Sequence, residues 1–173
     1  MDNRPILVAY ATRAGSTREV AEAIGQTLNE HGANNEVRSV TDVTDLHPYR
    51  AVILGSAIHA GRWLPEAVRF TSQHRSDLEQ TPLIYFLVCG TLREDTPEHH
   101  REVLAYLDPV RAIAQPLEIG LFAGRINADH LPLLERMMVK VMRSPQGDWR
   151  DWTAIHEWAG GVADRLQAEK EVA

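Results

Sequence analysis

A short loop near the start of the chain has the residue types of an anion-binding site. Residues 12–17 read TRAGST; they follow an apolar run and precede a helical pattern, so they are predicted to join a strand to a helix. The first turn of a helix has unpaired backbone N–H groups at the positive end of its dipole, and such groups bind phosphate. Thr12, Ser16 and Thr17 add hydroxyl donors. The loop therefore predicts a phosphate site for a mononucleotide, and the alternative is an ordinary helix start capped by Ser16 or Thr17.

The loop lacks the motifs of two common nucleotide sites. Gly15 is its single glycine, so the Gly-x-Gly-x-x-Gly sequence of dinucleotide-binding folds is missing. No lysine follows Gly15, as it would in a loop that holds a triphosphate and magnesium. One glycine among hydroxyl side chains instead fits a phosphate monoester held without a metal.

The rest of the chain predicts the elements that position this loop. Apolar runs predict five strands, at residues 4–10, 35–40, 50–55, 82–89 and 115–123, and helical periodicity predicts helices at residues 16–31, 65–74, 97–107, 130–143 and 151–168. Strands that alternate with helices are typical of a parallel sheet with helices on both faces. We therefore expect a single α/β domain over residues 1–173, with a doubly wound five-stranded parallel sheet of strand order 2-1-3-4-5.

Two further loops are expected at the same end of this sheet. In a doubly wound sheet, ligands bind beyond the carboxyl ends of the strands, where the strand order reverses. The candidate ligand-binding residues in the two loops are Ser56, Ala57, Ile58, His59, Ala60, Gly61 and Trp63, and Cys89, Gly90, Thr91 and Leu92. Gly55 and Gly61 would let a flat ligand approach the backbone, and Trp63 would lie against an aromatic ring.

Three side chains of these loops have both an ordinary and a functional interpretation. His59 is either a solvated loop histidine or a group that hydrogen-bonds the ligand and moves a proton near neutral pH. Arg62 is either a surface arginine or a group that attracts an anionic substrate. Cys89 is expected to be a small buried hydrophobe rather than a redox thiol.

The predicted helix at residues 130–143 carries an apolar stripe. Its members are Leu131, Leu133, Leu134, Met137, Met138, Val139, Val141 and Met142, with Arg136, Lys140 and Arg143 nearby. The favoured interpretation is that this stripe packs in the core. The alternative is an exposed face that contacts a protein partner, a quinone or, weakly, a membrane surface.

Composition excludes some classes of protein. With 44% hydrophobic residues the chain can bury a sizeable core, and with a net charge of −6 and no long basic stretch it is not expected to bind nucleic acid. The chain shows no signal-peptide pattern and a single cysteine, so a cytoplasmic location is expected. The first and third strands end without the acidic residues that a phosphorelay receiver needs, and no metal site is expected. The oligomeric state stays open, with a homodimer among the options.

Residues 12–17 resemble the T-x-T-G-x-T loop that binds the FMN phosphate in the flavodoxin family, with Ala14 in place of the middle threonine. The order of elements resembles that family over nearly the whole chain. The resemblance implies noncovalent FMN, with residues 12–17 around the phosphate and the other two loops beside the isoalloxazine ring. Because the flavin carries the redox chemistry, no protein nucleophile or acid–base pair is required.

Within that family, the chain is similar to the quinone-dependent protoporphyrinogen oxidases. The similarity lies in residues 16–19 (STRE), residues 55–61 (GSAIHAG), residues 122–125 (FAGR), the Met/Val-rich helix and Asp151-Trp152. The segment before Asp151 is shorter and less basic than in those oxidases, and Leu92 stands where electron-carrying flavodoxins often have an aromatic residue. The resemblance implies an FMN-dependent oxidoreductase that acts on a flat organic molecule, a porphyrinogen or a quinone. The alternatives are an electron carrier for redox protein partners and a domain that binds no flavin.

Overall fold

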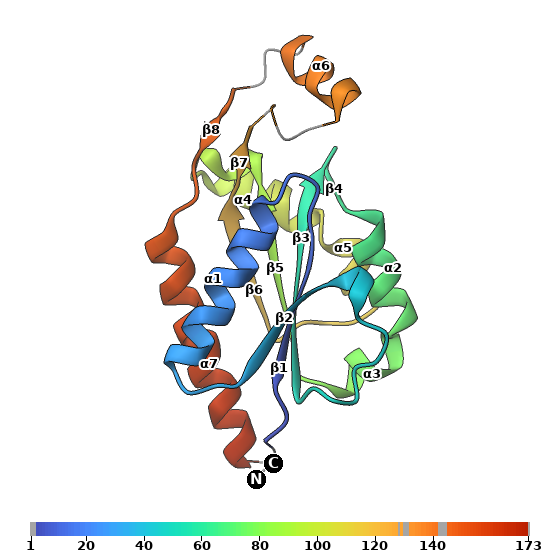
Figure 1. Ribbon diagram of the computed structural model, residues 1–173, viewed down its shortest axis with the longest axis vertical. Coiled ribbons are helices and arrows are strands. Elements are labelled where there is room, and N and C mark those ends of the chain that lie inside the picture. Colours follow the sequence, from blue (N-terminus) through green and yellow to red (C-terminus); the bar gives the residue numbers. More distant parts are fainter. Residues whose placement is uncertain (1–2, 128, 130–131, 142–144, 173) are drawn as a thin grey trace.

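The fold is built on a parallel sheet with the strand order β2-β1-β3-β5-β6 (Figure 1). The computed structural model describes residues 3–172 except 128, 130–131 and 142–144. The five strands are β1 (Ile6–Ala11), β2 (Asn35–Ser39), β3 (Ala51–His59), β5 (Leu83–Cys89) and β6 (Glu118–Ala123). Counted along the chain without the short hairpin strand β4, this is the predicted order 2-1-3-4-5, and the predicted doubly wound α/β fold is confirmed.

Helices cover both faces of the sheet. One face carries α1 (Ser16–Glu30) and α7 (Trp152–Val172), and the other carries α2 (Pro65–Gln73), α3 (Arg75–Gln80), α4 (Pro97–Ala105) and α5 (Asp108–Arg111) (Figure 1). Two short 3-10 helices, η1 (Val40–Asp42) and η2 (Gly90–Arg93), follow β2 and β5.

Alternation along each strand divides the core into two clusters. In β1, Ile6 and Val8 pack against α1 and α7, whereas Leu7 and Ala9 pack against the opposite helical layer. Successive side chains of a strand point to opposite faces, so a strand covered on both sides must be apolar throughout. This requirement is why the apolar runs predicted the central strands.

The third strand is longer than predicted and turns back on itself. β3 continues to His59 and pairs antiparallel with β4 (Arg62–Trp63). The turn between them consists of Ala60 and Gly61, whose φ angles are 50° and 71°. Two successive residues with positive φ match the two-residue turns that hairpins prefer, so residues 59–62 form a rigid hairpin tip rather than an open loop.

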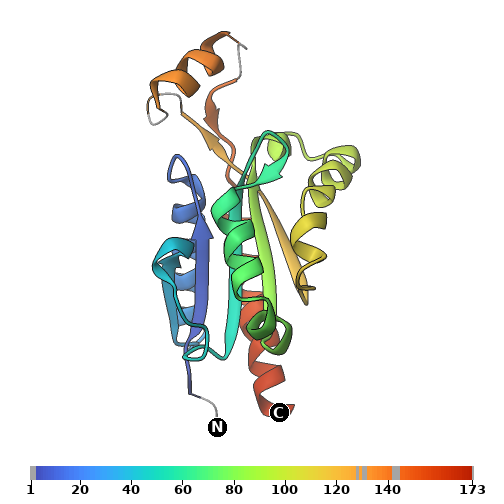
Figure 2. The ribbon, with the colours of Figure 1, turned by 90° about the vertical axis from the view of Figure 1, so that its right-hand side faces the viewer.

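An arm leaves the sheet after β6. β7 (Arg125–Ile126) and β8 (Gly147–Asp148) form a two-stranded antiparallel ribbon that carries α6 (Leu133–Val141) beyond the carboxyl ends of the sheet (Figures 1 and 2). The sequence predicted a helix here but not the ribbon, because each of its strands has only two residues.

The expectation that this helix packs in the core is wrong. No residue of α6 is buried, and Leu133 and Val141 are 79% and 82% exposed. The physical reason is that the arm lifts α6 away from both helical layers, so nothing described in the structure covers its apolar side (Figure 2). Leu131 and Met142, which the prediction placed on the same stripe, lie outside the described residues. Within residues 3–172, apart from the gaps given above, no helix is long and apolar enough to cross a bilayer.

Candidate functional site

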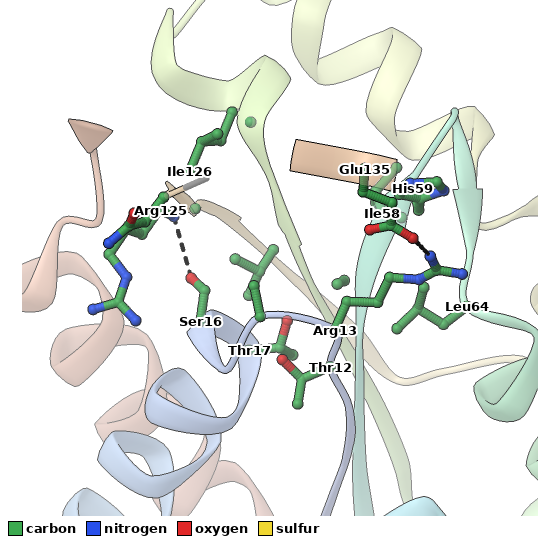
Figure 3. Close-up of a pocket in the computed structure, with 16 residues that line it drawn as sticks. Thr12, Arg13, Ser16, Thr17, Ile58, His59, Leu64, Arg125, Ile126 and Glu135 are labelled. Carbon is green, nitrogen blue, oxygen red and sulfur yellow. Dashed lines mark hydrogen bonds and ion pairs between the residues drawn. The ribbon is translucent and has the colours of Figure 1, made fainter. Parts of the chain in front are cut away.

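A pocket of about 230 Å³ opens at the carboxyl ends of the central strands (Figure 3). The three loops singled out in the sequence all contribute to it, together with the arm. The lining residues are Thr12, Arg13, Ala14, Ser16, Thr17, Ala57, Ile58, His59, Leu64, Val88, Gly90, Gly124, Arg125, Ile126, Asn127 and Glu135. The pocket lies where β1 and β3 are neighbours, which is the reversal point of the strand order.

The loop over residues 12–17 has the geometry of an anion site. Gly15 is left-handed, with φ 87°, and its N–H donates a hydrogen bond to Thr12 Oγ1 at 3.0 Å. α1 begins at Ser16, and Gly15 offers no side chain to cap the first turn. The unpaired N–H groups that every helix has at its start are therefore left for a ligand at the edge of the pocket.

Thr17 provides an independent indication that a ligand belongs here. Its side chain is fully buried and lines the pocket, yet Oγ1 has no hydrogen-bond partner among the residues that the structure describes. An unsatisfied buried hydroxyl costs about 1–3 kcal/mol, and a phosphate oxygen would accept its hydrogen bond. Thr12 and Thr17 lie together below the pocket in Figure 3. The residues present thus fit the phosphate of FMN.

Ser16 connects the loop to the arm. Its Oγ accepts a hydrogen bond from the backbone N–H of Arg125 at 3.2 Å (Figure 3). A hydroxyl oxygen that accepts one bond can still donate its proton, so Ser16 can serve both the arm and an anion.

A network of charges holds the arm against α1. Glu19 binds Arg125 at 3.0 Å and also pairs with Arg150, which binds Asp148 at 2.6 Å and lies 4.5 Å from the centre of the Trp152 ring. Burial opposes ionisation of the Glu19 carboxyl, but Arg150 and Arg125 outweigh that effect and hold its pKa below the ordinary value. The hydrogen bond from Arg150 likewise lowers the pKa of Asp148.

The hairpin loop contributes less than its sequence suggested. Ser56 is fully buried; its Oγ accepts a bond from the N–H of Leu64 at 3.0 Å and donates one to the carbonyl of Ala57 at 2.8 Å. Its hydroxyl therefore braces the hairpin. A Cβ on Gly55 would meet the Phe86 ring at 2.0 Å, so this glycine makes room for a core aromatic rather than for a ligand.

Trp63 lies in the core and not in the pocket lining. It is 4% exposed and packs edge-on against Tyr85, with the ring centres 5.2 Å apart. Trp63 pairs with Ile58 across the hairpin, and opposed residues share one face, which here is the face turned to the α2 layer. The indole of Trp63 therefore does not face the pocket, where the sequence placed it against an aromatic ligand.

Other expected residues flank the pocket without lining it. These are Gly15, Ala60, Gly61, Arg62, Cys89, Thr91 and Leu92. Cys89 and Leu92 are buried in the core, and Ala60, Gly61 and Arg62 form the hairpin tip and the start of β4. The lining residues that sequence reasoning missed come mostly from the arm, such as Ile126, Asn127 and Glu135. No local motif marks them, because only the return of the arm over the sheet brings them to the site.

Comparison with known proteins identifies the family of this chain. The model of the flavodoxin domain family matches residues 7–153. A protein of Leishmania major named protoporphyrinogen IX dehydrogenase [quinone] is 25% identical, over 91% of this chain and 74% of its own. The Escherichia coli K12 protein of the same name is 22% identical, over 91% of this chain and 93% of its own.

Solved structures show the same fold. A flavodoxin from the domain Archaea superposes with a TM-score of 0.60 at 17% identity, covering 94% of this chain and 99% of its own. The family match spans nearly the whole sheet, the loop over residues 12–17 and the arm, and it identifies FMN as the cofactor, as the resemblance implied. The chain belongs to the flavodoxin domain family and is an FMN-dependent oxidoreductase.

Proposed function

We propose that the protein oxidises a porphyrinogen and passes the hydrogen to a quinone. The observation that carries this proposal is the similarity, over 91% of the chain, to two proteins named protoporphyrinogen IX dehydrogenase [quinone]. Each oxidation step would remove two electrons and two protons from the porphyrinogen and reduce one quinone to its hydroquinone. FMN, when bound, supplies this redox chemistry.

The chain's own residues would bind the cofactor, orient it and shield it from water. Thr17 Oγ1 and the start of α1 would hold the phosphate. Ala57, Ile58, Val88 and Ile126 give the pocket an apolar wall, which excludes water and suits flat organic rings. His59 lines the opening, where its side chain is exposed to solvent.

The outer face of α6 supports a further part of the proposal, a contact with a lipid surface. Leu134, Met138 and Val141 lie four and three residues apart on one side of the helix, and all are more than half exposed. Lys140 adds a positive charge near this face. An amphipathic helix of this kind binds at the boundary of a bilayer, where a lipophilic quinone would dissolve.

The test is turnover by the FMN-loaded protein. The absorbance spectrum of the loaded protein first establishes that the flavin is bound. Formation of the fluorescent porphyrin from protoporphyrinogen is then followed with menadione as the acceptor, against FMN alone as the blank. Quinone-dependent turnover supports the proposal. Failure to turn over, with reduced protein still passing electrons to a redox protein, would indicate the carrier function instead.

A further inference from the structure

The hairpin tip places a histidine and an arginine beside each other at the edge of the pocket. His59 is directly opposite Arg62 in the antiparallel pairing of β3 with β4. Side chains of opposed residues lie on the same face of a hairpin, with Cβ atoms about 4.5–5.5 Å apart. His59 lines the pocket, as does its neighbour Ile58, whereas Arg62 is not among the lining residues. Through its pairing, Arg62 lies next to His59 at the border of the pocket, outside the lining itself.

Among the described residues, His59 and Arg62 are the basic side chains at the site that have no ion-pair partner. Arg13 pairs with Glu135, and Arg125 pairs with Glu19. For His59 and Arg62, the structure shows no hydrogen bond or ion pair with any residue that it describes. Both side chains are exposed. An incoming anion would thus meet free donors at the hairpin, because the remaining cations around the pocket have partners.

The hairpin is also rigid, which a binding subsite requires. Ser56 braces its base through the bond from the N–H of Leu64, and the turn at Ala60 and Gly61 has the backbone that two-residue hairpins prefer. A Cβ on Gly61 would lie 3.3 Å from the Tyr106 ring, so the tip rests against the residue that ends α4. Preorganised donors lose little freedom when they bind.

We infer that His59 and Arg62 form a subsite for a carboxylate group of the substrate. This inference rests on the proposed function, since protoporphyrinogen is an apolar macrocycle that bears carboxylate side chains. The guanidinium of Arg62 can bind a carboxylate with two parallel N–H···O bonds, and an imidazole N–H of His59 can add a third. The apolar wall begins at Ile58, directly before His59, so the subsite lies where a ring edge would meet solvent.

The experiment compares protoporphyrinogen with its dimethyl ester, which has the same ring and no carboxylate charge. In the FMN-loaded protein, Arg62→Gln should raise the KM for the dicarboxylate about tenfold and leave the KM for the ester unchanged. Arg62→Lys should restore part of the loss. Arg69→Gln removes another exposed positive charge, on α2, and serves as the control that should change neither KM. The affinity for FMN should be the same in all variants.

The outcomes separate this inference from the proposed function. If the wild-type protein turns over both substrates and Arg62→Gln changes neither KM, the subsite is refuted while the function stands. If the wild-type protein turns over neither substrate, the function fails, and the subsite is tested by fluorescence titration with protoporphyrin and its dimethyl ester. A preference for the dicarboxylate that Arg62→Gln abolishes then supports the subsite, and equal affinities overturn it.

Discussion

Arg13 and Glu135 form an ion pair across the pocket, although 122 residues separate them in the sequence (Figure 3). Arg13 belongs to the loop over residues 12–17 and Glu135 to α6, so this pair joins the arm to the predicted phosphate site. Glu135 thereby offsets the attraction that Arg13 would otherwise exert on a phosphate.

Glu135→Gln should therefore strengthen FMN binding. Removal of one carboxylate near the phosphate site leaves Arg13 uncompensated, and an exposed pair of this kind is worth about 0.2–1 kcal/mol, which corresponds to an affinity gain of at most about fivefold. The gain should shrink as salt is added, because salt screens exposed charges. Fluorescence titration of FMN at low and high salt measures both effects. Glu79→Gln removes the partner of Arg75 on α3 and is the control. Weaker FMN binding by Glu135→Gln would show that the ion pair helps to hold FMN in the site, and that Glu135 does not compete with the phosphate for Arg13.

Thr17→Val should affect the empty protein and the complex in opposite directions. In the empty protein the substitution replaces an unsatisfied buried hydroxyl with a methyl group of similar size, so the melting temperature should stay the same or rise. In the complex it removes a hydrogen bond to a charged phosphate, which should cost about 1.5–3 kcal/mol of binding free energy. Differential scanning calorimetry and FMN titration measure the two effects, with Thr17→Ser as the variant that keeps the hydroxyl. Unchanged FMN affinity in Thr17→Val would mean that the phosphate lies elsewhere.

The charge network at Glu19 predicts a loss of stability in acid. The pKa values of Glu19 and Asp148 lie below their ordinary values of 4.5 and 3.8, so their ionised forms stabilise the folded state. That contribution is complete above the ordinary values and is lost as the pH falls through the lower folded-state values. Urea unfolding from pH 6 to pH 3 should therefore show a falling free energy of unfolding.

Glu19→Gln should make that fall shallower, because one of the two titrating carboxylates is gone. Glu22→Gln removes an exposed carboxylate that pairs with Arg18 on the same helix, and it should leave the acid dependence close to that of the wild type. Parallel curves for wild type and Glu19→Gln would contradict the role given to the network.

The proposed contact of α6 with lipid can be tested with substitutions that should not disturb the fold. Leu134→Glu together with Met138→Glu should leave the free energy of unfolding nearly unchanged, since both side chains are more than half exposed. Cosedimentation with vesicles of phosphatidylglycerol and phosphatidylcholine should decrease, because charges replace the apolar contact. Leu117→Glu alters another exposed apolar residue, away from α6, and is the control. If wild type and double variant bind vesicles equally, α6 does not contact lipid.

Sequence patterns predicted the sheet because burial on both faces forces the central strands to be apolar. They predicted a loop between β1 and α1 because residues 12–17, with one glycine and three hydroxyl side chains, separate the apolar run from the helical pattern. They did not predict what covers α6, since an apolar stripe has the same periodicity whether a core or a partner covers it. Nor did they place Trp63, because its face depends on the hairpin pairing with Ile58.

The arm has a consequence for how proteins of this shape can diversify. Among the described residues, neither core cluster has a member between Gly124 and Trp152. The arm therefore contributes no residue to the two core clusters. Substitutions in this stretch should therefore disturb the apolar core little, provided that the charge network of Arg125, Asp148 and Arg150 with Glu19 is kept. A flavoprotein built in this way can acquire new substrates or partners through changes in the arm alone.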